Sequence, residues 1–140
     1  MDKYGLIGKN IDYSFSRVYF NEKFKLNKIE AKYVNFDLDS LDNFAAILKQ
    51  ETQLKGLNIT IPYKEEIISF LDEIDSNAEA IGAVNCIALE SGKLKGYNTD
   101  YIGFRDALIP LLEVHHKRAL ILGSGGAAKA VQYALDELGI

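Results

Sequence analysis

A lysine that follows a short apolar segment is the first candidate for chemistry in this sequence. Lys64 ends the run N-I-T-I-P-Y-K at positions 58–64. Because side chains alternate along a strand, Asn58 and Thr60 point to the same face, and Pro62, which has no N–H, should end the strand. A lysine beside apolar walls and polar neighbours can donate or accept a proton near neutral pH. The alternative is a strand edge followed by a solvated helix start, and the heptapeptide alone favours that interpretation.

Two serines form a second group of candidate residues. Ser14 and Ser16 lie between an expected strand end and an expected helix start. Their hydroxyls, together with the free N–H groups of a first helical turn, could hold a carboxylate. Simple N-capping by either serine is the competing explanation, and local sequence favours it.

An asparagine and an aspartate supply further polar groups. Asn85 follows Gly82-Ala83-Val84 and offers a donor and an acceptor among apolar residues. If buried, it must find partners in the protein or in a ligand hydroxyl, and both alternatives stay open. Asp100 precedes an expected helix, so it is either an N-cap or a partner for Lys64. The lysine–carboxylate pair requires the strands before the two residues to end on the same side of the sheet.

A glycine-rich turn follows the apolar run 119–122. Strand, glycine turn and helix are typical of the phosphate-binding start of a dinucleotide fold, because glycine permits a tight turn and the helix N-terminus offers N–H groups. The candidate cofactor-binding residues are Gly123, Ser124, Gly125, Gly126 and Ala127.

Strands and helices alternate along most of the chain. Strands are expected at 4–8, 29–36, 57–61, 83–89, 93–97 and 118–122, and helices at 14–26, 41–48, 65–71, 75–81, 100–112 and 127–138. The turn at 90–92 predicts an antiparallel hairpin. The pattern predicts an α/β fold with a mostly parallel sheet and flanking helices. A boundary near 112–117 divides residues 1–112, one sheet domain, from 113–140, an incomplete Rossmann-type unit.

Composition excludes several classes of protein. The chain has 140 residues and a net charge of −4, and without a basic stripe it is not expected to bind nucleic acid. No signal peptide or membrane-spanning run is expected. The sole cysteine, Cys86, favours a reducing cytoplasm. His115 and His116 lie near no cysteine or H-x-x-x-H pattern, so no metal site is expected.

Taken together, the candidate segments have a common order and spacing. They are Tyr4-Gly5-Leu6-Ile7-Gly8, Ser14-x-Ser16, Asn58-x-Thr60-x-Pro62-x-Lys64, Gly82-Ala83-Val84-Asn85, Asn98-Thr99-Asp100 and Gly123-x-Gly125-Gly126-Ala127. Each is weakly specific alone, but in this order over the whole chain they closely resemble the shikimate dehydrogenase family. The resemblance implies NADPH-dependent reduction of 3-dehydroshikimate to shikimate, on the route to aromatic amino acids.

The resemblance also implies a role for each matched residue. Ser14 and Ser16 would hold the substrate carboxylate, and Asn58, Thr60 and Asn85 would bind ring hydroxyls. Lys64 and Asp100 would be the catalytic pair in contact with substrate, with Lys64 supplying a proton and positive charge to the developing alkoxide. The glycine turn would bind NADP(H).

The sequence departs from the family pattern in some positions and in length. Tyr13, Arg17, Cys86 and Ser124 stand where the family often has histidine, proline, threonine and alanine. Family members are about twice as long as a typical domain. The chain is therefore expected to be an inactive fragment, a folded substrate domain with a poorly supported tail that a second copy, in a homodimer, could order. The resemblance implies that a second cofactor strand carries the residues that choose NADP over NAD, and no such strand is expected within these 140 residues.

Two alternative functions remain open from the sequence. One is a quinate/shikimate dehydrogenase of broader specificity, since Ser14 and Ser16 do not exclude quinate. The other is a binding module that holds shikimate-like acids without redox activity.

Overall fold

A single six-stranded sheet forms the centre of the computed structural model, which describes residues 1–140. The strands are β1 (Asp2–Gly8), β2 (Ala31–Asp37), β3 (Leu54–Ile59), β4 (Glu73–Ile74), β5 (Cys86–Glu90) and β6 (Lys93–Tyr97). Their order is β2-β1-β3-β5-β6-β4. β1 pairs in parallel with β2 and β3, and β4 with β6, whereas β5 is antiparallel to β3 and β6. The expected mostly parallel α/β sheet with an antiparallel hairpin is confirmed.

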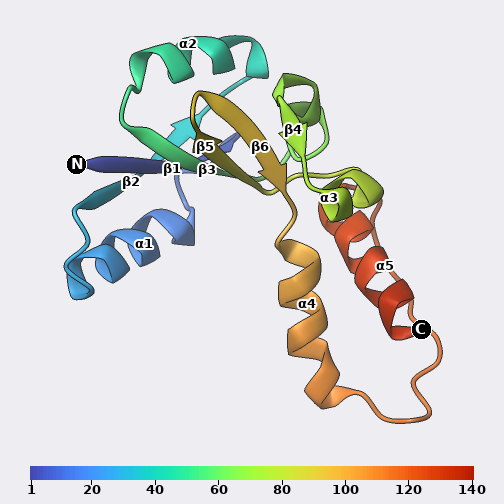
Figure 1. Cartoon of the computed structure of the whole chain (residues 1–140). Helices are drawn as coiled ribbons and strands as arrows, with labels where there is room; N and C mark the ends of the chain where they lie inside the picture. Colours follow the sequence, from blue (N-terminus) through green and yellow to red (C-terminus); the bar gives the residue numbers. More distant parts are fainter.

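Helices cover both faces of the sheet. They are α1 (Phe15–Leu26), α2 (Phe44–Gln50), α3 (Ser76–Ile81), α4 (Asp100–Leu108) and α5 (Gly126–Leu138), with 3₁₀ turns η1 (Leu41–Asn43), η2 (Glu66–Phe70) and η3 (Ile109–Leu111). α1 lies on one face and α2 on the other (Figure 1). None of these helices combines the length and the apolar composition needed to cross a bilayer.

The main core lies on the α2 side of the sheet. It is built from strand residues that alternate inward and from the turns above them, and its members are Ile7, Leu41, Phe44, Leu54, Leu57, Ile59, Tyr63, Ile67, Ala78, Val84 and Ile87. A smaller cluster on the α1 side contains Leu6, Ile11 and Tyr33, with Phe20 and Phe24 of α1 packed against it. The predicted alternation of β2, with Tyr33 opposite Phe36, is confirmed because the two residues belong to different clusters.

The sheet brings the candidate residues to one edge. β1, β3 and β6 run in the same direction, so their carboxyl ends lie at the same edge, and β5, which runs the other way, begins there. Ser14 follows β1, Lys64 follows β3, Asp100 follows β6 and Asn85 precedes β5. Ligands of open α/β sheets bind at such an edge.

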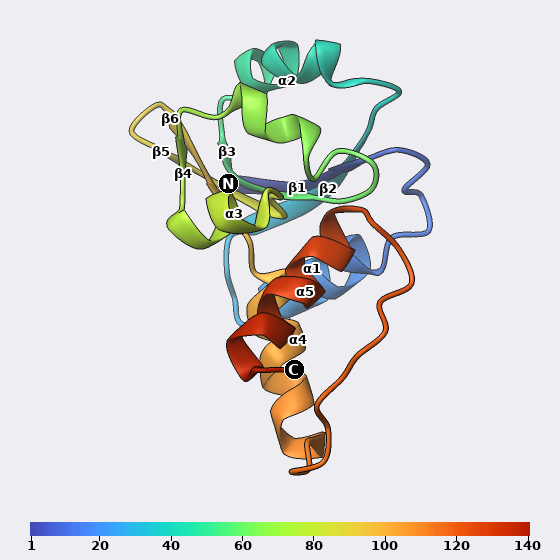
Figure 2. The ribbon, with the colours of Figure 1, turned by 90° about the vertical axis from the view of Figure 1, so that its right-hand side faces the viewer.

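The last helix packs against the sheet domain. Ala130 and Ala134 of α5 are fully buried against Ile81, Ala83 and Tyr101. Figure 2 shows α5 beside α4, with the chain between them returning as an extended segment. The expectation of a poorly supported tail is therefore right for this segment but wrong for α5.

The predicted strand at 118–122 does not form. These residues have no regular secondary structure, and Leu120 and Leu122 are 85% and 89% exposed. A strand needs a neighbour for its backbone N–H and C=O groups, and this chain offers none at that place. The strand of the expected Rossmann-type unit is therefore missing, while its glycine turn and helix are present.

Three smaller differences have local causes. The helix predicted at 65–71 is instead the 3₁₀ turn η2 (Glu66–Phe70), and the two-residue strand β4 is too short to leave a sequence pattern. Val18 and Tyr19, expected on the apolar side of α1, are 56% and 42% exposed, because only Phe20 and Phe24 reach the sheet.

The exposed segment 118–122 should tolerate the introduction of a charged side chain. We expect Leu122→Lys to change the free energy of unfolding by less than about 0.5 kcal/mol, because its side chain contacts solvent. Leu57→Ala, at a core position, should cost about 2–5 kcal/mol. Urea unfolding followed by circular dichroism measures both, and a large loss for Leu122→Lys would contradict this packing.

Candidate active site

The centre of the site is an ion pair between residues that are far apart in sequence. Lys64 Nζ donates to Asp100 Oδ2 at 2.6 Å, and the two side chains are 15% and 34% exposed. The pairing expected from the strand ends is therefore present. An ammonium this little exposed needs a charged partner, and Asp100 supplies it.

Backbone contacts fix the position of the lysine. Val84 N donates to Lys64 O at 2.7 Å, which ties the residue to the segment before β5. The neighbouring Tyr63 is buried and donates its hydroxyl to Leu38 O at 2.6 Å. Gly126 of α5 packs on the stem of the lysine, since a Cβ there would lie 2.9 Å from Lys64 Cβ. Only glycine fits between the helix and the lysine.

Asn85 holds the aspartate from the other side. Its Nδ2 donates to Asp100 Oδ1 at 2.7 Å and to Thr99 Oγ1 at 2.9 Å, and its Oδ1 accepts from Thr99 N at 2.7 Å. Asn85 is 8% exposed. The sequence left open whether Asn85 finds its hydrogen-bond partners in the protein or in a ligand hydroxyl. The structure shows partners within the protein. Both amide hydrogens are used, so Asn85 orients Asp100.

Asn98 belongs to the segment Asn98-Thr99-Asp100, but sequence reasoning assigned it no role of its own. Its Oδ1 accepts from Asp100 N at 3.0 Å and from Tyr101 N at 3.3 Å, and its Nδ2 donates to Ala83 O at 2.9 Å. Asn98 thus satisfies the first N–H groups of α4, and neither Thr99 nor Asp100 caps the helix with its side chain. The preference of asparagine for such positions was the available signal. Asp100 is left free to hold Lys64.

The serine loop is held by the end of β2. Asp37 Oδ1 accepts from Asn10 N at 2.8 Å and its Oδ2 accepts from Ile11 N at 3.0 Å. Ser14 Oγ accepts from Ser16 N at 3.2 Å, so Ser14 caps α1, as the competing explanation from the sequence requires. Sequence reasoning missed Asp37, because nothing in the sequence near position 37 shows that its carboxylate accepts hydrogen bonds from the backbone of the serine loop.

Asn58 and Thr60 lie on the face that α1 covers, at the end of β3. Asn58 accepts a hydrogen bond from Tyr33 Oη at 2.8 Å. Thr60 N donates to Ile7 O at 2.9 Å, and its methyl group packs against Gly8, where a Cβ would lie 2.5 Å from it. Both side chains are partly exposed, so they remain accessible from the edge of the sheet.

The glycine turn opens onto the lysine. A cavity of about 270 Å³ is lined by Ile61, Pro62, Lys64, Glu65, Gly125 and Gly126. Gly125 is the N-cap of α5, so no side chain caps the helix, and a Cβ at Gly125 would meet no atom within 4 Å. Gly123 has a φ of 140°. The first N–H groups of a helix have no partner within it and favour anions. These residues, with the exposed Ser124 and Ala127, fit a nucleotide phosphate.

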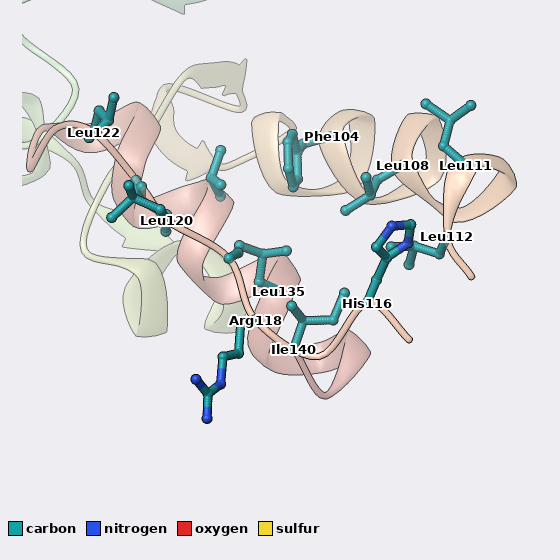
Figure 3. Close-up of a pocket in the computed structure, with 13 residues that line it drawn as sticks. Phe104, Leu108, Leu111, Leu112, His116, Arg118, Leu120, Leu122, Leu135 and Ile140 are labelled. Atoms are coloured by element: carbon teal, nitrogen blue, oxygen red, sulfur yellow. The ribbon is translucent and has the colours of Figure 1, made fainter. Parts of the chain in front are cut away.

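The largest cavity lies elsewhere. It measures about 460 Å³, and its lining is mostly apolar side chains of α4, α5 and the segment between them, including Phe104, Leu108, Leu120, Leu135 and Ile140 (Figure 3). None of the residues proposed above for chemistry lines it. Its apolar character indicates a surface for packing rather than for catalysis.

Comparison with known proteins agrees with this geometry. Residues 6–87 match the sequence profile described as the shikimate dehydrogenase substrate binding domain. The chain belongs to this family.

Individual relatives cover the whole chain. Shikimate dehydrogenase (NADP(+)) of Clostridium botulinum is 48% identical over 137 residues, which is 96% of this chain and 53% of the relative. The crystal structure of shikimate dehydrogenase 1 from Peptoclostridium difficile superposes with a TM-score of 0.91 at 38% identity and covers 100% of this chain and 53% of that one. Shikimate 5-dehydrogenase from Thermus thermophilus, solved with NADP(H) and shikimate, has a TM-score of 0.88 at 31% identity, with 100% and 54% covered. The chain spans about half the length of the curated relatives it matches.

The asparagine that orients Asp100 should also matter for stability. We expect Asn85→Ala to lower the free energy of unfolding by about 1–3 kcal/mol, since a buried side chain is lost together with its partly buried hydrogen bond from Thr99 N. Asn35→Ala is the comparison and should cost under about 1 kcal/mol, because its Oδ1 has no partner and only its Nδ2 is bonded, to Ile11 O at 3.0 Å. Urea unfolding tests both, and equal losses would argue against the Asn85 network.

Proposed function

We propose that this chain is the substrate-binding and proton-transfer part of an NADP-dependent shikimate dehydrogenase, which interconverts 3-dehydroshikimate and shikimate. The observation that carries the proposal is the Lys64–Asp100 pair of 2.6 Å beside Gly126 of the glycine turn. A proton donor and a nucleotide-binding turn at one opening are what a dehydrogenase requires. The names of the relatives support the same activity.

The proposed substrate site uses the polar groups at the sheet edge. The carboxylate of the ligand lies at Ser14 and Ser16, where hydroxyls and the N-terminal end of α1 favour negative charge. Ring hydroxyls lie at Asn58 and Thr60, and at Asp100, which Asn85 orients. This arrangement accepts a small ring acid with several hydroxyls.

Lys64 carries the proton transfer. NADPH, when bound, supplies the hydride to the ketone carbon. The oxygen of that ketone gains negative charge, and Lys64 Nζ stabilises it and donates a proton to it. Asp100 keeps the ammonium aimed at this oxygen and accepts a hydrogen bond from a neighbouring ring hydroxyl. In the reverse direction Lys64 accepts the proton.

The glycine turn holds the cofactor in this proposal. Gly123, Ser124, Gly125, Gly126 and Ala127 offer backbone N–H groups to its phosphates, and the contact of Gly126 with Lys64 places the turn next to the proton donor. The preference for NADP over NAD is taken from the relatives alone.

The apolar surface of Figure 3 fits the remainder of a cofactor-binding sheet. Leu120 and Leu122 lie in an extended segment that has no strand beside it. In the relatives, about half of the protein lies outside the part that this chain covers. We propose that a strand from such a half pairs with 118–122. A homodimer that buries the same surface is the other arrangement, and sedimentation velocity of the chain alone tests for it.

Shikimate binding is the direct test of the substrate site. We expect the chain to bind shikimate in a calorimetric or NMR titration, and we expect the double change Ser14→Ala and Ser16→Ala to weaken binding by about 10–100-fold, because hydrogen bonds to a carboxylate are lost. Ser40→Ala is the matched control, since Ser40 also caps a helical turn but lies away from the site. An unchanged affinity in the double variant would place the carboxylate elsewhere.

Lys64 can be tested by turnover in a longer protein. We expect the chain joined to the second half of the Clostridium botulinum relative to oxidise NADPH with 3-dehydroshikimate, and we expect Lys64→Ala to lower kcat by about 10²–10⁴-fold with little change in KM. Lys93→Ala is the control, because Lys93 forms an exposed pair with Glu73 at 2.8 Å. An unchanged kcat in Lys64→Ala would remove Lys64 from its role, and equal rates with quinate would broaden the substrate class.

A further inference from the structure

Tyr33 is a buried polar residue that the proposed chemistry does not use. It lies in β2, is 3% exposed, and stacks on Phe20 of α1 with ring centroids 4.8 Å apart and 19° between the planes. A phenylalanine would fill this apolar place equally well, so packing does not explain the hydroxyl. Buried hydroxyls are retained where they have a hydrogen-bonding partner.

The partner of the hydroxyl is a residue of the proposed site. Tyr33 Oη donates to Asn58 Oδ1 at 2.8 Å. At its other end, Asn58 Nδ2 donates to Asn85 O at 3.4 Å. A carbonyl accepts hydrogen bonds only, so it requires the nitrogen end of the amide, while the phenol takes the oxygen end. The two contacts agree on one orientation of the Asn58 amide.

We propose that Tyr33 is a positioning residue for ligand selection: its hydroxyl holds Asn58 so that the side chain presents an N–H to the ligand. This inference rests on the proposed function, and it makes that function more specific. Asn58 Nδ2 carries two hydrogens, of which Asn85 O takes one. The second is available to an acceptor oxygen, so the site selects ring acids that carry a hydroxyl or carbonyl oxygen opposite Asn58.

The chemical state of the phenol supports this role. Burial raises the pKa of Tyr33 well above its usual range, and a negative charge on Cys86 would raise it further. The hydroxyl therefore keeps its proton throughout the physiological pH range and remains a donor to Asn58.

The test compares two ligands on one variant. Tyr33→Phe keeps the ring that stacks on Phe20 and removes only the hydroxyl. We expect NMR titration to show shikimate binding weakened by about 3–10-fold, the effect of losing one ordered hydrogen bond. Binding of cyclohexene-1-carboxylate, which has the carboxylate but no ring hydroxyls, should be unchanged. In the ligand-free variant the side-chain NH₂ resonances of Asn58 should shift.

A second tyrosine variant serves as a control, because it loses the same kind of hydroxyl at a place away from the proposed site. Tyr133 Oη donates to Asn77 Oδ1 at 3.0 Å, the same kind of tyrosine–asparagine bond, between α5 and α3. Tyr133→Phe should leave both affinities unchanged. In an Asn58→Ala background, Tyr33→Phe should cause no further loss of shikimate affinity, because the two residues act as one unit.

The outcomes distinguish this inference from the proposed function. Shikimate binding that is unaffected by Tyr33→Phe, or weakened equally for both ligands, would overturn the inference and leave the proposed function in place. Failure of the unmodified chain to bind shikimate would overturn the proposed function, and the inference with it.

Discussion

The need of a poorly solvated ammonium for a fixed counter-charge organises this molecule. Lys64 is 15% exposed, and its charge is tolerated because Asp100 lies 2.6 Å away. Asp100 in turn stays in place because Asn85 donates a hydrogen bond to its other carboxylate oxygen. Asn98 caps α4, so the side chain of Asp100 is not needed as the cap. These contacts join the ends of β3 and β6 to the start of β5. Loss of any one of them would be expected to move the Lys64 ammonium, the proposed proton donor, even with the sheet intact.

The packing of α5 adds a second constraint to the same place. The helix meets the sheet domain through small side chains, Ala130 and Ala134, so it approaches closely enough for Gly126 to touch the stem of Lys64. Lys129 of the same helix is paired with Glu65 at 2.5 Å, next to the lysine. The distance between the proposed phosphate-binding turn and the proton donor is thus set by contacts within this chain. In a dehydrogenase, that distance fixes how cofactor and substrate face each other.

The polar residues of the proposed site have partners within this chain, whereas the apolar residues of the segment 118–122 do not. Lys64, Asp100, Asn58 and Asn85 already have defined partners within the protein. Leu120 and Leu122, in contrast, are exposed. The hydrogen bonds of the polar residues join neighbouring strand ends, so they form once the sheet itself has formed. An extended segment becomes a strand only when another strand takes up its backbone hydrogen bonds.

Local patterns in the sequence were sufficient for most of the fold and for the residue types of the site. Alternation, helical periodicity and the turn at 90–92 correctly placed the hairpin, most helices and five strands of the sheet. The polar residues at the strand ends indicated the edge of the sheet at which Lys64 and Asp100 meet. Those patterns work because backbone geometry and turn preferences act over a few residues. Tertiary structure alone decided that 118–122 stays unpaired, that Asn98 rather than Asp100 satisfies α4, and that Asp37 and Tyr33 support the site. Each of these outcomes depends on a partner from a distant part of the chain, and a hydrogen bond between distant residues leaves no periodic trace near either of them.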